Sequence, residues 1–259
     1  MNGTLNLQHL QIAFDIWGAR PYNLAMAKLE NPHEREPLSQ SIEDYLKAVY
    51  ELTRGENERA STNALAEYLA VAPASVTGML QKLSNTQPPL LDYRKHRGVS
   101  LTPEGEKVAL ETIRHHRLLE LFLHQILGYE WHEVHEEADR LEHVISERFE
   151  ERIAEALGDP RRDPHGDPIP SADLRLPLDS ERPLSALRPG ERATVVRVRD
   201  TAPDLLQHLS ERGILPQAHL EVTSFSEFDG NLHLRVEDAV EEIVLGPRIT
   251  AQVFVEIDK

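Results

Sequence analysis

The spacing of apolar residues changes once along this 259-residue chain, at a segment rich in proline and glycine. From about residue 39 to 157, apolar residues recur every three or four positions, as in helices with one buried face. Beyond residue 182 they alternate with polar residues, as in half-buried strands. Residues 158–170, between the two patterns, hold too many helix breakers to be helical and are expected to form a linker or an ordered loop. The sequence therefore predicts an α+β chain of several domains, helical first and β-rich last.

The last part of the chain has the pattern of a small β domain. Strands are expected at residues 193–198, 220–223, 232–236 and 250–255, with one helix at 203–212. A half-open β-barrel of about 75 residues fits this order.

Two short helices and two short strands are predicted between residues 61 and 102. The helices, at 61–70 and 75–83, are joined by a tight turn and share a buried apolar face, as in a helix-turn-helix. Strands at 90–93 and 99–102 then enclose a basic hairpin tip, Arg94-Lys95-His96-Arg97-Gly98. A helix-turn-helix followed by a basic hairpin predicts a winged helix.

The second of these helices begins with small polar residues, as a helix that enters the major groove of DNA does. We expect base or phosphate contacts from Ser75, Thr77, Gly78 and Gln81. The basic tip would contact the phosphate backbone through Arg94, Lys95 and Arg97, and such contacts weaken as salt rises. The alternative is a winged helix that makes only protein contacts.

Charge is distributed unevenly along the chain. The net charge of −16 argues against generic polyanion binding, but residues 71–98 carry four basic residues and one acidic residue, whereas 130–159 carry three basic and eleven acidic ones. The absence of cysteine excludes disulfides, zinc fingers and iron–sulfur clusters. Because we find neither an apolar run of about eighteen residues nor a signal-peptide pattern, we expect a cytoplasmic protein without membrane contact.

Histidine and acidic residues gather on two long helices, predicted at about 102–123 and 131–157. The second helix carries four of them at i, i+4, i+7 and i+8: His135, Asp139, Glu142 and His143. At roughly 100° per residue, these four span an arc of about 100° and can reach one point beside the helix. On the first helix, His116 and Glu120 repeat the i, i+4 spacing. Converging carboxylates and imidazoles suit a divalent cation, which removes the repulsion between the carboxylates.

A single acidic residue beside a histidine is more often part of a solvated face, but the joint pattern on adjacent helices favours a metal site. The chain has no His-Glu-x-x-His motif, and no Ser or Cys nucleophile lies near either cluster in the sequence. A metal site beside a winged helix indicates a sensor, so we expect no catalytic residues and no small organic substrate. The alternatives are a metallohydrolase and a protein-interaction module whose histidines merely pack.

Several motifs from Ser39 onward occur together in one known family. They include Ile42-Glu43-Asp44-Tyr45-Leu46, His116-Arg117-Leu118-Leu119-Glu120, Val134-His135-Glu136-Glu137-Ala138-Asp139, Glu142-His143 and His165-Gly166-Asp167-Pro168-Ile169-Pro170. In these stretches the chain resembles the diphtheria-toxin-repressor family of metalloregulators, which has iron-sensing and manganese-sensing branches. Residues 1–38 have no counterpart in it, and their role is unknown.

The resemblance implies a winged-helix DNA-binding domain, a helical metal-binding and dimerisation domain, and an SH3-like C-terminal domain. After the extension at 1–38, we place these parts at residues 39–103, 104–160 and 183–259, with a Pro/Gly-rich linker at 161–182. The resemblance also implies a homodimer whose two recognition helices span a palindrome in double-stranded DNA.

The resemblance also assigns the ligands to two metal sites. One would use Asp44, Asp139, Glu142 and His143, and the other His116, Glu120 and His135. Iron-sensing members have sulfur ligands at the positions of Asp44 and Asp139, so the oxygen donors here favour Mn²⁺, with Fe²⁺ as the alternative. Lys47 stands where some manganese sensors have another carboxylate, which argues against their closely paired metals. In the C-terminal domain, Asp200 is the nearest further candidate, but Arg197 stands where a carboxylate would help.

The resulting hypothesis is a Mn²⁺-activated homodimeric repressor of metal-uptake genes. Metal would bind the DNA-competent arrangement better than the open one, so metal and DNA would each tighten the binding of the other.

Overall fold

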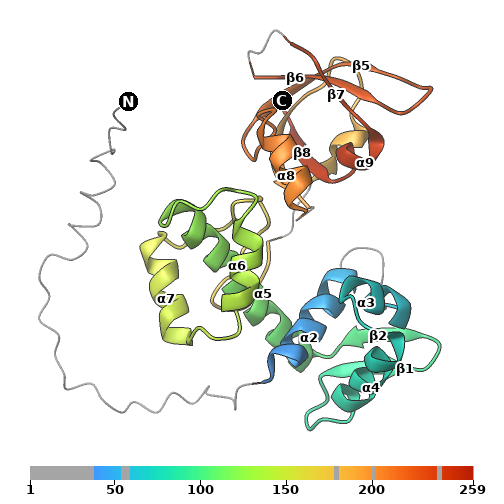
Figure 1. Cartoon of the computed structure of the whole chain (residues 1–259), viewed down its shortest axis with the longest axis vertical. Coiled ribbons are helices and arrows are strands. Elements are labelled where there is room, and N and C mark those ends of the chain that lie inside the picture. Colours follow the sequence, from blue (N-terminus) through green and yellow to red (C-terminus); the bar gives the residue numbers. More distant parts are fainter. Residues whose placement is uncertain (1–37, 54–58, 178–180, 200–201, 238–240, 259) are drawn as a thin grey trace, which may run out of the picture. The chain divides into compact units, whose positions relative to one another are not determined.

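The computed structural model describes residues 38–53, 59–177, 181–199, 202–237 and 241–258 (Figure 1). Nearly all of the predicted N-terminal extension lies outside these residues. Within them, helices α2 to α7 and one β-hairpin precede a part that contains strands β3 to β8. This order confirms the α+β class that the change of hydrophobic period predicts.

The first part is the predicted winged helix. It contains α2 (Gln40–Thr53), α3 (Thr62–Tyr68), α4 (Pro73–Ser84), β1 (Leu91–Arg94) and β2 (Gly98–Leu101). Ser61 caps α3 by accepting a hydrogen bond from the backbone of Ala64, and Pro73 starts α4 at a position where no backbone N–H is needed. Four leucines have no exposed surface and hold the helices together: Leu46, Leu65, Leu80 and Leu83.

The wing depends on one glycine. Strands β1 and β2 pair antiparallel, with Arg94 opposite Gly98. Gly98 has a φ of +86°, and a Cβ there would lie 2.5 Å from the carbonyl oxygen of Ala60. Only glycine therefore allows the hairpin to lie against the segment that leads into α3.

The metal-binding part contains three helices rather than the expected two. Helix α5 (Pro103–Gln125) starts as predicted, capped by Thr102. The prediction of a single helix over 131–157 is wrong, because α6 (Val134–Leu141) and α7 (Glu147–Ala156) are separate. Ser146 accepts a hydrogen bond from the backbone of Phe149 and so begins α7 after a turn. Apolar spacing is helical on both sides of the turn, so the period alone does not reveal it.

The segment that the sequence predicts to be a linker or an ordered loop is an ordered loop over the residues described, up to 177. Asp163, His165 and Ile169 of this loop are buried. Gly166 has a φ of +88°, and a Cβ there would lie 2.0 Å from the carbonyl oxygen of Val196 in the next part of the chain. The loop therefore packs directly on the β-rich part.

The β-rich part is one open antiparallel sheet in the order β3-β8-β4-β5-β6-β7. Its strands are β3 (Arg182–Pro183), β4 (Arg192–Val198), β5 (His219–Phe225), β6 (Leu232–Val236), β7 (Ile243–Leu245) and β8 (Val253–Ile257). Helices α8 (Pro203–Ser210) and α9 (Pro247–Thr250) and a short 3₁₀ helix (Leu184–Ala186) accompany the sheet. The strand expected at 250–255 starts later, at Val253, because α9 takes the residues before it. Val195, Leu206, Leu234 and Val255 lie in a common core.

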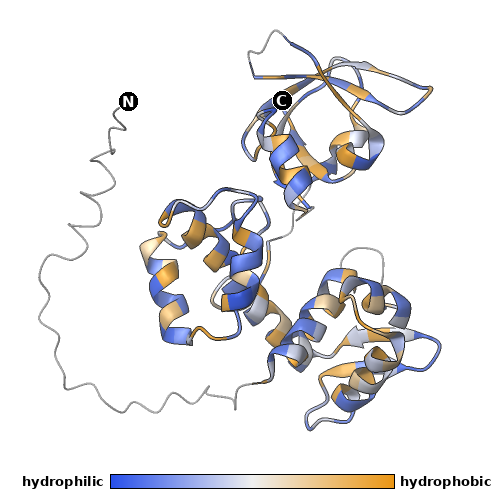
Figure 2. Cartoon of the chain, viewed as in Figure 1, coloured by the Kyte–Doolittle hydropathy of each residue, from blue (hydrophilic) through white to orange (hydrophobic). Residues whose placement is uncertain are grey.

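Hydrophobic and hydrophilic residues alternate along the helices (Figure 2). Among the described residues, no helix is both long enough and apolar enough to cross a membrane. The apolar faces instead supply the cores between the elements.

Candidate metal centre

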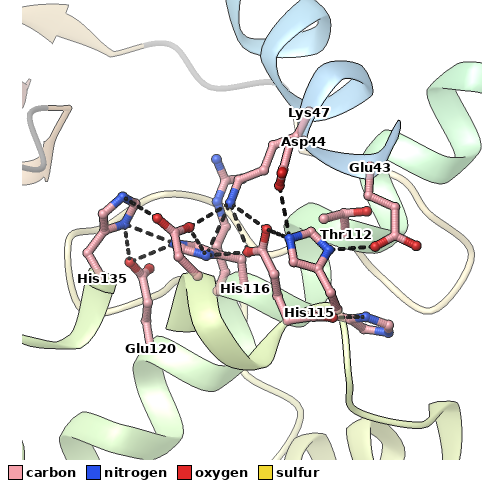
Figure 3. A network of polar contacts seen from close by, with 12 residues as sticks. Glu43, Asp44, Lys47, Thr112, His115, His116, Glu120 and His135 are labelled. Atoms are coloured by element: carbon pink, nitrogen blue, oxygen red, sulfur yellow. Dashed lines mark hydrogen bonds and ion pairs between the residues drawn. The ribbon is translucent and has the colours of Figure 1, made fainter. Parts of the chain in front are cut away.

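Four segments of the chain bring the predicted ligands together (Figure 3). Helix α5 carries His116 and Glu120, α6 carries His135 and Asp139, and the turn after α6 carries Glu142 and His143. The fourth segment is α2 of the winged helix, which brings Glu43, Asp44 and Lys47 to the same place. The candidate ligands of the two domains therefore meet at one centre.

The first cluster consists of Asp44, Glu142 and His143, whose ligand atoms all lie within 4.8 Å of one another. The Nε2 atom of His143 is 2.9 Å from Asp44 Oδ1 and 3.3 Å from Glu142 Oε1. The Nδ1 atom of the same ring is 2.5 Å from Glu43 Oε2. Glu43 can thus hold the proton on Nδ1 and leave Nε2 to a cation, as carboxylates beside metal-bound histidines do. No local pattern in the sequence indicates this role for Glu43.

The second cluster consists of His116, Glu120 and His135. His116 Nε2 lies 2.9 Å from Glu120 Oε1 and 3.0 Å from His135 Nδ1, and His135 Nδ1 lies 3.1 Å from the same Glu120 oxygen. Glu120 is only 2% exposed. Two ring nitrogens and one carboxylate oxygen therefore converge on one point.

Asp139 lies apart from the first cluster, although the resemblance places it there. Its Oδ1 is 3.2 Å from His116 Nδ1 and 3.2 Å from Lys47 Nζ. Asp139 forms a ligand-like group with His116 and Glu142 instead of with Asp44. Lys47 also contacts both carboxylate oxygens of Glu142, at 3.0 and 2.8 Å.

The carboxylates and imidazoles of the centre stabilise each other's charged forms. Burial alone would lower the pKa of His143, but hydrogen bonds with Asp44 and Glu43 raise it to about 9. Burial would raise the pKa of Glu120, whereas the charge of His116 and hydrogen bonds from the neighbouring histidines hold it well below the usual value. Burial would also lower the pKa of Lys47, but the charges of Glu142 and Asp139 hold it above the usual value. A cation that binds here must therefore displace imidazole protons.

Two residues of the ordered loop approach the second cluster. Glu120, Asp163 and His165 form a further group with ligand atoms within 4.8 Å, and His165 Nδ1 lies 3.7 Å from Glu120 Oε2. Burial and the neighbouring carboxylates of Glu120 and Asp167 raise the pKa of Asp163 to about 8. Neither His165 nor Asp163 was predicted as a site residue. Their sole signal in the sequence is the position of the family motif that begins at His165.

In the C-terminal domain, the sequence offers Asp200 as a candidate ligand but disfavours it because of Arg197. Asp200 lies outside the described residues. Arg197 is 6% exposed and pairs with Asp167 and with the carboxylate of Glu181. It lines a cavity of about 370 Å³ that also borders His116, Glu120 and His135. Arg197 therefore helps hold the β-rich part against the loop.

His115, next to His116 in the sequence, belongs to a separate ion-pair network between α5 and α7. Its Nε2 is 3.0 Å from Glu150 Oε2, and Arg114 Nε is 2.6 Å from Glu150 Oε1. Burial would lower the pKa of His115, but hydrogen bonds with Glu147 and Glu150 raise it to about 10. Nε2 of His115 thus lies at ion-pair distance from α7, and Nδ1 lies 3.1 Å from the Glu142 carbonyl oxygen.

The predicted DNA-contacting residues lie on α4 and on the wing. Ser75, Gly78 and Gln81 are exposed, whereas Thr77 is partly buried and its hydroxyl donates to the Pro73 carbonyl at 3.0 Å. An added Cβ at Gly78 would meet no atom within 4 Å. On the wing, Arg94, Lys95 and Arg97 are exposed, and Arg94 Nη2 is 3.0 Å from Asp92 Oδ2. The start of α4 thus has an open surface.

Known families match three parts of the chain. Residues 37–99 match the iron dependent repressor N-terminal DNA binding domain, residues 102–171 match the iron dependent repressor metal binding and dimerisation domain, and residues 182–257 match the FeoA domain. Over 198 residues the chain is 32% identical to the iron-dependent repressor IdeR of Mycobacterium leprae, covering 71% of this chain and 84% of that protein. The chain belongs to the iron-dependent repressor family.

One further relative and one solved structure narrow the range of possible functions. The chain is 39% identical over 113 residues to the HTH-type transcriptional regulator MntR of Bacillus pumilus, covering 44% of this chain and 76% of that protein. A solved manganese-dependent transcriptional repressor in complex with manganese superposes with a TM-score of 0.76 at 38% identity, covering 83% of this chain and 98% of that one. These relatives are transcriptional regulators rather than enzymes, so the metallohydrolase alternative is rejected. Iron and manganese both occur among them.

Proposed function

We propose that this protein is a cytoplasmic, Mn²⁺-activated homodimeric repressor that binds a palindromic operator of metal-uptake genes. The metal ligands would be Asp44, Glu142 and His143 in the first cluster and His116, Glu120 and His135 in the second. Asp139 would join the first cluster by a change of side-chain rotamer, which its 49% exposed side chain permits. The proposal extends the activity named for the relatives to this chain.

One observation carries the proposal: the first cluster joins two domains. Asp44 lies on α2 of the winged helix, whereas Glu142 and His143 follow α6 of the metal-binding part. In the bound state, the cation would supply the positive charge that holds the Asp44 and Glu142 carboxylates together. The protein residues would then keep α2, and with it the recognition helix α4, in one fixed position. Metal binding and DNA binding are coupled to the extent that DNA requires that position.

The donor atoms favour manganese. Both clusters offer only carboxylate oxygens and imidazole nitrogens, and the chain has no cysteine. Hard oxygen donors suit Mn²⁺ better than softer metals, although they also accept Fe²⁺. The relatives include both types, so the choice between the two metals depends on this donor chemistry.

The homodimer is supported by the exposed apolar residues of the metal-binding part. Ile126 and Leu127 at the end of α5, Val144 in the turn after α6 and Phe149 on α7 are each about half exposed or more. Such residues commonly mark a protein interface. The matching family description also names this region a dimerisation domain.

The test is operator binding in a metal titration. DNA selected from random sequence by the Mn²⁺-loaded protein would be labelled and titrated at one salt concentration with Mn²⁺, Fe²⁺ or no metal. We expect tight binding with Mn²⁺, weaker activation by Fe²⁺ and little binding without metal. Equal affinity with and without Mn²⁺ would contradict the proposal, and stronger activation by Fe²⁺ would replace manganese with iron.

A further inference from the structure

Lys47 places a positive charge between the two clusters. Its Nζ lies 2.8 Å from Glu142 Oε2, 3.0 Å from Glu142 Oε1, 3.2 Å from Asp139 Oδ1 and 3.2 Å from His116 Nδ1. The side chain reaches this position from α2 and is only 17% exposed. In Figure 3 the ammonium group points into the polar network rather than toward solvent.

The atoms around Lys47 have the arrangement of a cation site. His116, Asp139 and Glu142 form a third group whose ligand atoms lie within 4.8 Å of one another; it shares Glu142 with the first cluster and His116 with the second. Glu142 is 2% exposed, so its negative charge requires a partner inside the protein. Lys47 supplies a single positive charge beside Glu142, and the His116 ring also lies 2.5 Å from Glu142 Oε2.

Lys47 also competes for ligands of the first cluster. Glu142 belongs both to that cluster and to the group around Lys47. Asp139 contacts Lys47 and does not group with Asp44 in the first cluster. Whichever side chain occupies position 47 therefore decides how many carboxylate oxygens remain for divalent ions.

We propose that Lys47 is a resident cation of the centre, whose ammonium group occupies the position between the two clusters and excludes an additional divalent ion there. This inference rests on the proposed function, because it assumes that the two clusters bind metal. Each cluster would then hold its own ion, without a neighbouring ion that shares Glu142. The ammonium group would also keep α2 attached to the metal-binding part at this point without any metal.

The inference predicts the effect of reversing this charge. Lys47→Glu removes the ammonium group and adds a carboxylate beside Asp139 and Glu142, which together can bind a divalent ion. His116 can keep its Nδ1 proton on Glu142 and its Nε2 for the second cluster, so the additional ion does not require a second bond from that ring. Lys47→Arg retains the positive charge and should exclude the additional ion as lysine does.

The experiment measures Mn²⁺ bound per chain by equilibrium dialysis and metal analysis, using the full-length protein. We expect Lys47→Glu to bind one more Mn²⁺ per chain than the wild type, and Lys47→Arg to bind the same number as the wild type. Electron paramagnetic resonance gives an independent readout, because two Mn²⁺ ions that share a carboxylate couple magnetically. The coupled signal should appear only in Lys47→Glu.

Controls separate this inference from the proposed function. Lys107→Glu makes the same charge change at an exposed position of α5, where Lys107 pairs only weakly with Glu104, and should bind as the wild type does. If Lys47→Glu fails to fold without metal, Lys47→Gln tests the same point, with one more Mn²⁺ per chain expected at higher metal concentration. If folded Lys47→Glu and Lys47→Gln both bind the same number of Mn²⁺ ions as the wild type, the inference is overturned. A wild type that binds no Mn²⁺ overturns the proposed function itself.

Discussion

Replacing Asp44 with asparagine removes one negative charge from the first cluster and preserves the shape of the side chain. The Asp44 side chain is 40% exposed, and its Oδ1 lies 2.9 Å from His143 Nε2. His143 keeps Glu43 and Glu142 as partners after the change. Because exposed ion pairs contribute at most about 1 kcal/mol, the free energy of unfolding should change by no more than about 1 kcal/mol.

The effect on metal binding should be much larger. Residues that merely orient a metal ligand alter metal affinity by about ten- to a hundredfold, and Asp44 is proposed to be a ligand itself. We therefore expect Asp44→Asn to weaken Mn²⁺ binding at the first cluster on the order of a hundredfold, which corresponds to about 2.8 kcal/mol. Through linkage, the Mn²⁺ concentration needed for operator binding should rise, while the affinity for DNA without metal stays the same.

Calorimetry with Mn²⁺ and fluorescence anisotropy with labelled operator measure the two effects. Asp204→Asn, at the exposed start of α8, is the matched control, because it removes the same charge far from the centre in sequence. A folded Asp44→Asn protein that responds to the same Mn²⁺ concentration as the wild type would refute the reasoning. Asp44 would then be only a partner of His143.

Three further predictions test the surroundings of the centre. The affinity for Mn²⁺ should rise between about pH 7 and 9. His143 must release a proton to bind metal, and its pKa is raised to about 9. A Mn²⁺ affinity that calorimetry finds constant over this pH range would contradict the prediction. Glu150→Gln leaves His115 and Arg114 incompletely paired in a buried position. The free energy of unfolding, measured by urea denaturation, should fall by about 3 kcal/mol. A loss near zero would show that this network does not stabilise the fold. Gly166→Ala places a Cβ 2.0 Å from a carbonyl oxygen of β4 and should destabilise the fold by more than about 2 kcal/mol. Gly158→Ala is the control and should destabilise the fold less, because Gly158 also has a positive φ but a Cβ there meets no atom within 4 Å. Equal melting temperatures of the two variants would argue against the close approach at Gly166.

Local patterns in the sequence predicted most of the elements. The helix-turn-helix, the wing and the alternating strands depend on neighbours within a few residues, and caps such as Ser61 and Thr102 mark the helix starts. The break between α6 and α7 was missed, because apolar spacing continues across it and Ser146 was not identified as a cap.

The types of ligand were readable from the sequence, because His116 and Glu120, or His135 and Asp139, stand one helical turn apart. Which of them share a cation depends on residues from other elements. Glu43 lies 100 positions from His143, and no periodicity connects the two. Asp139 contacts Lys47 rather than Asp44 because tertiary packing places the positive charge of Lys47 beside its half-exposed carboxylate. Short-range spacing thus determined the elements and the donor atoms, whereas only the packing of α2 on the metal-binding helices decided the partners.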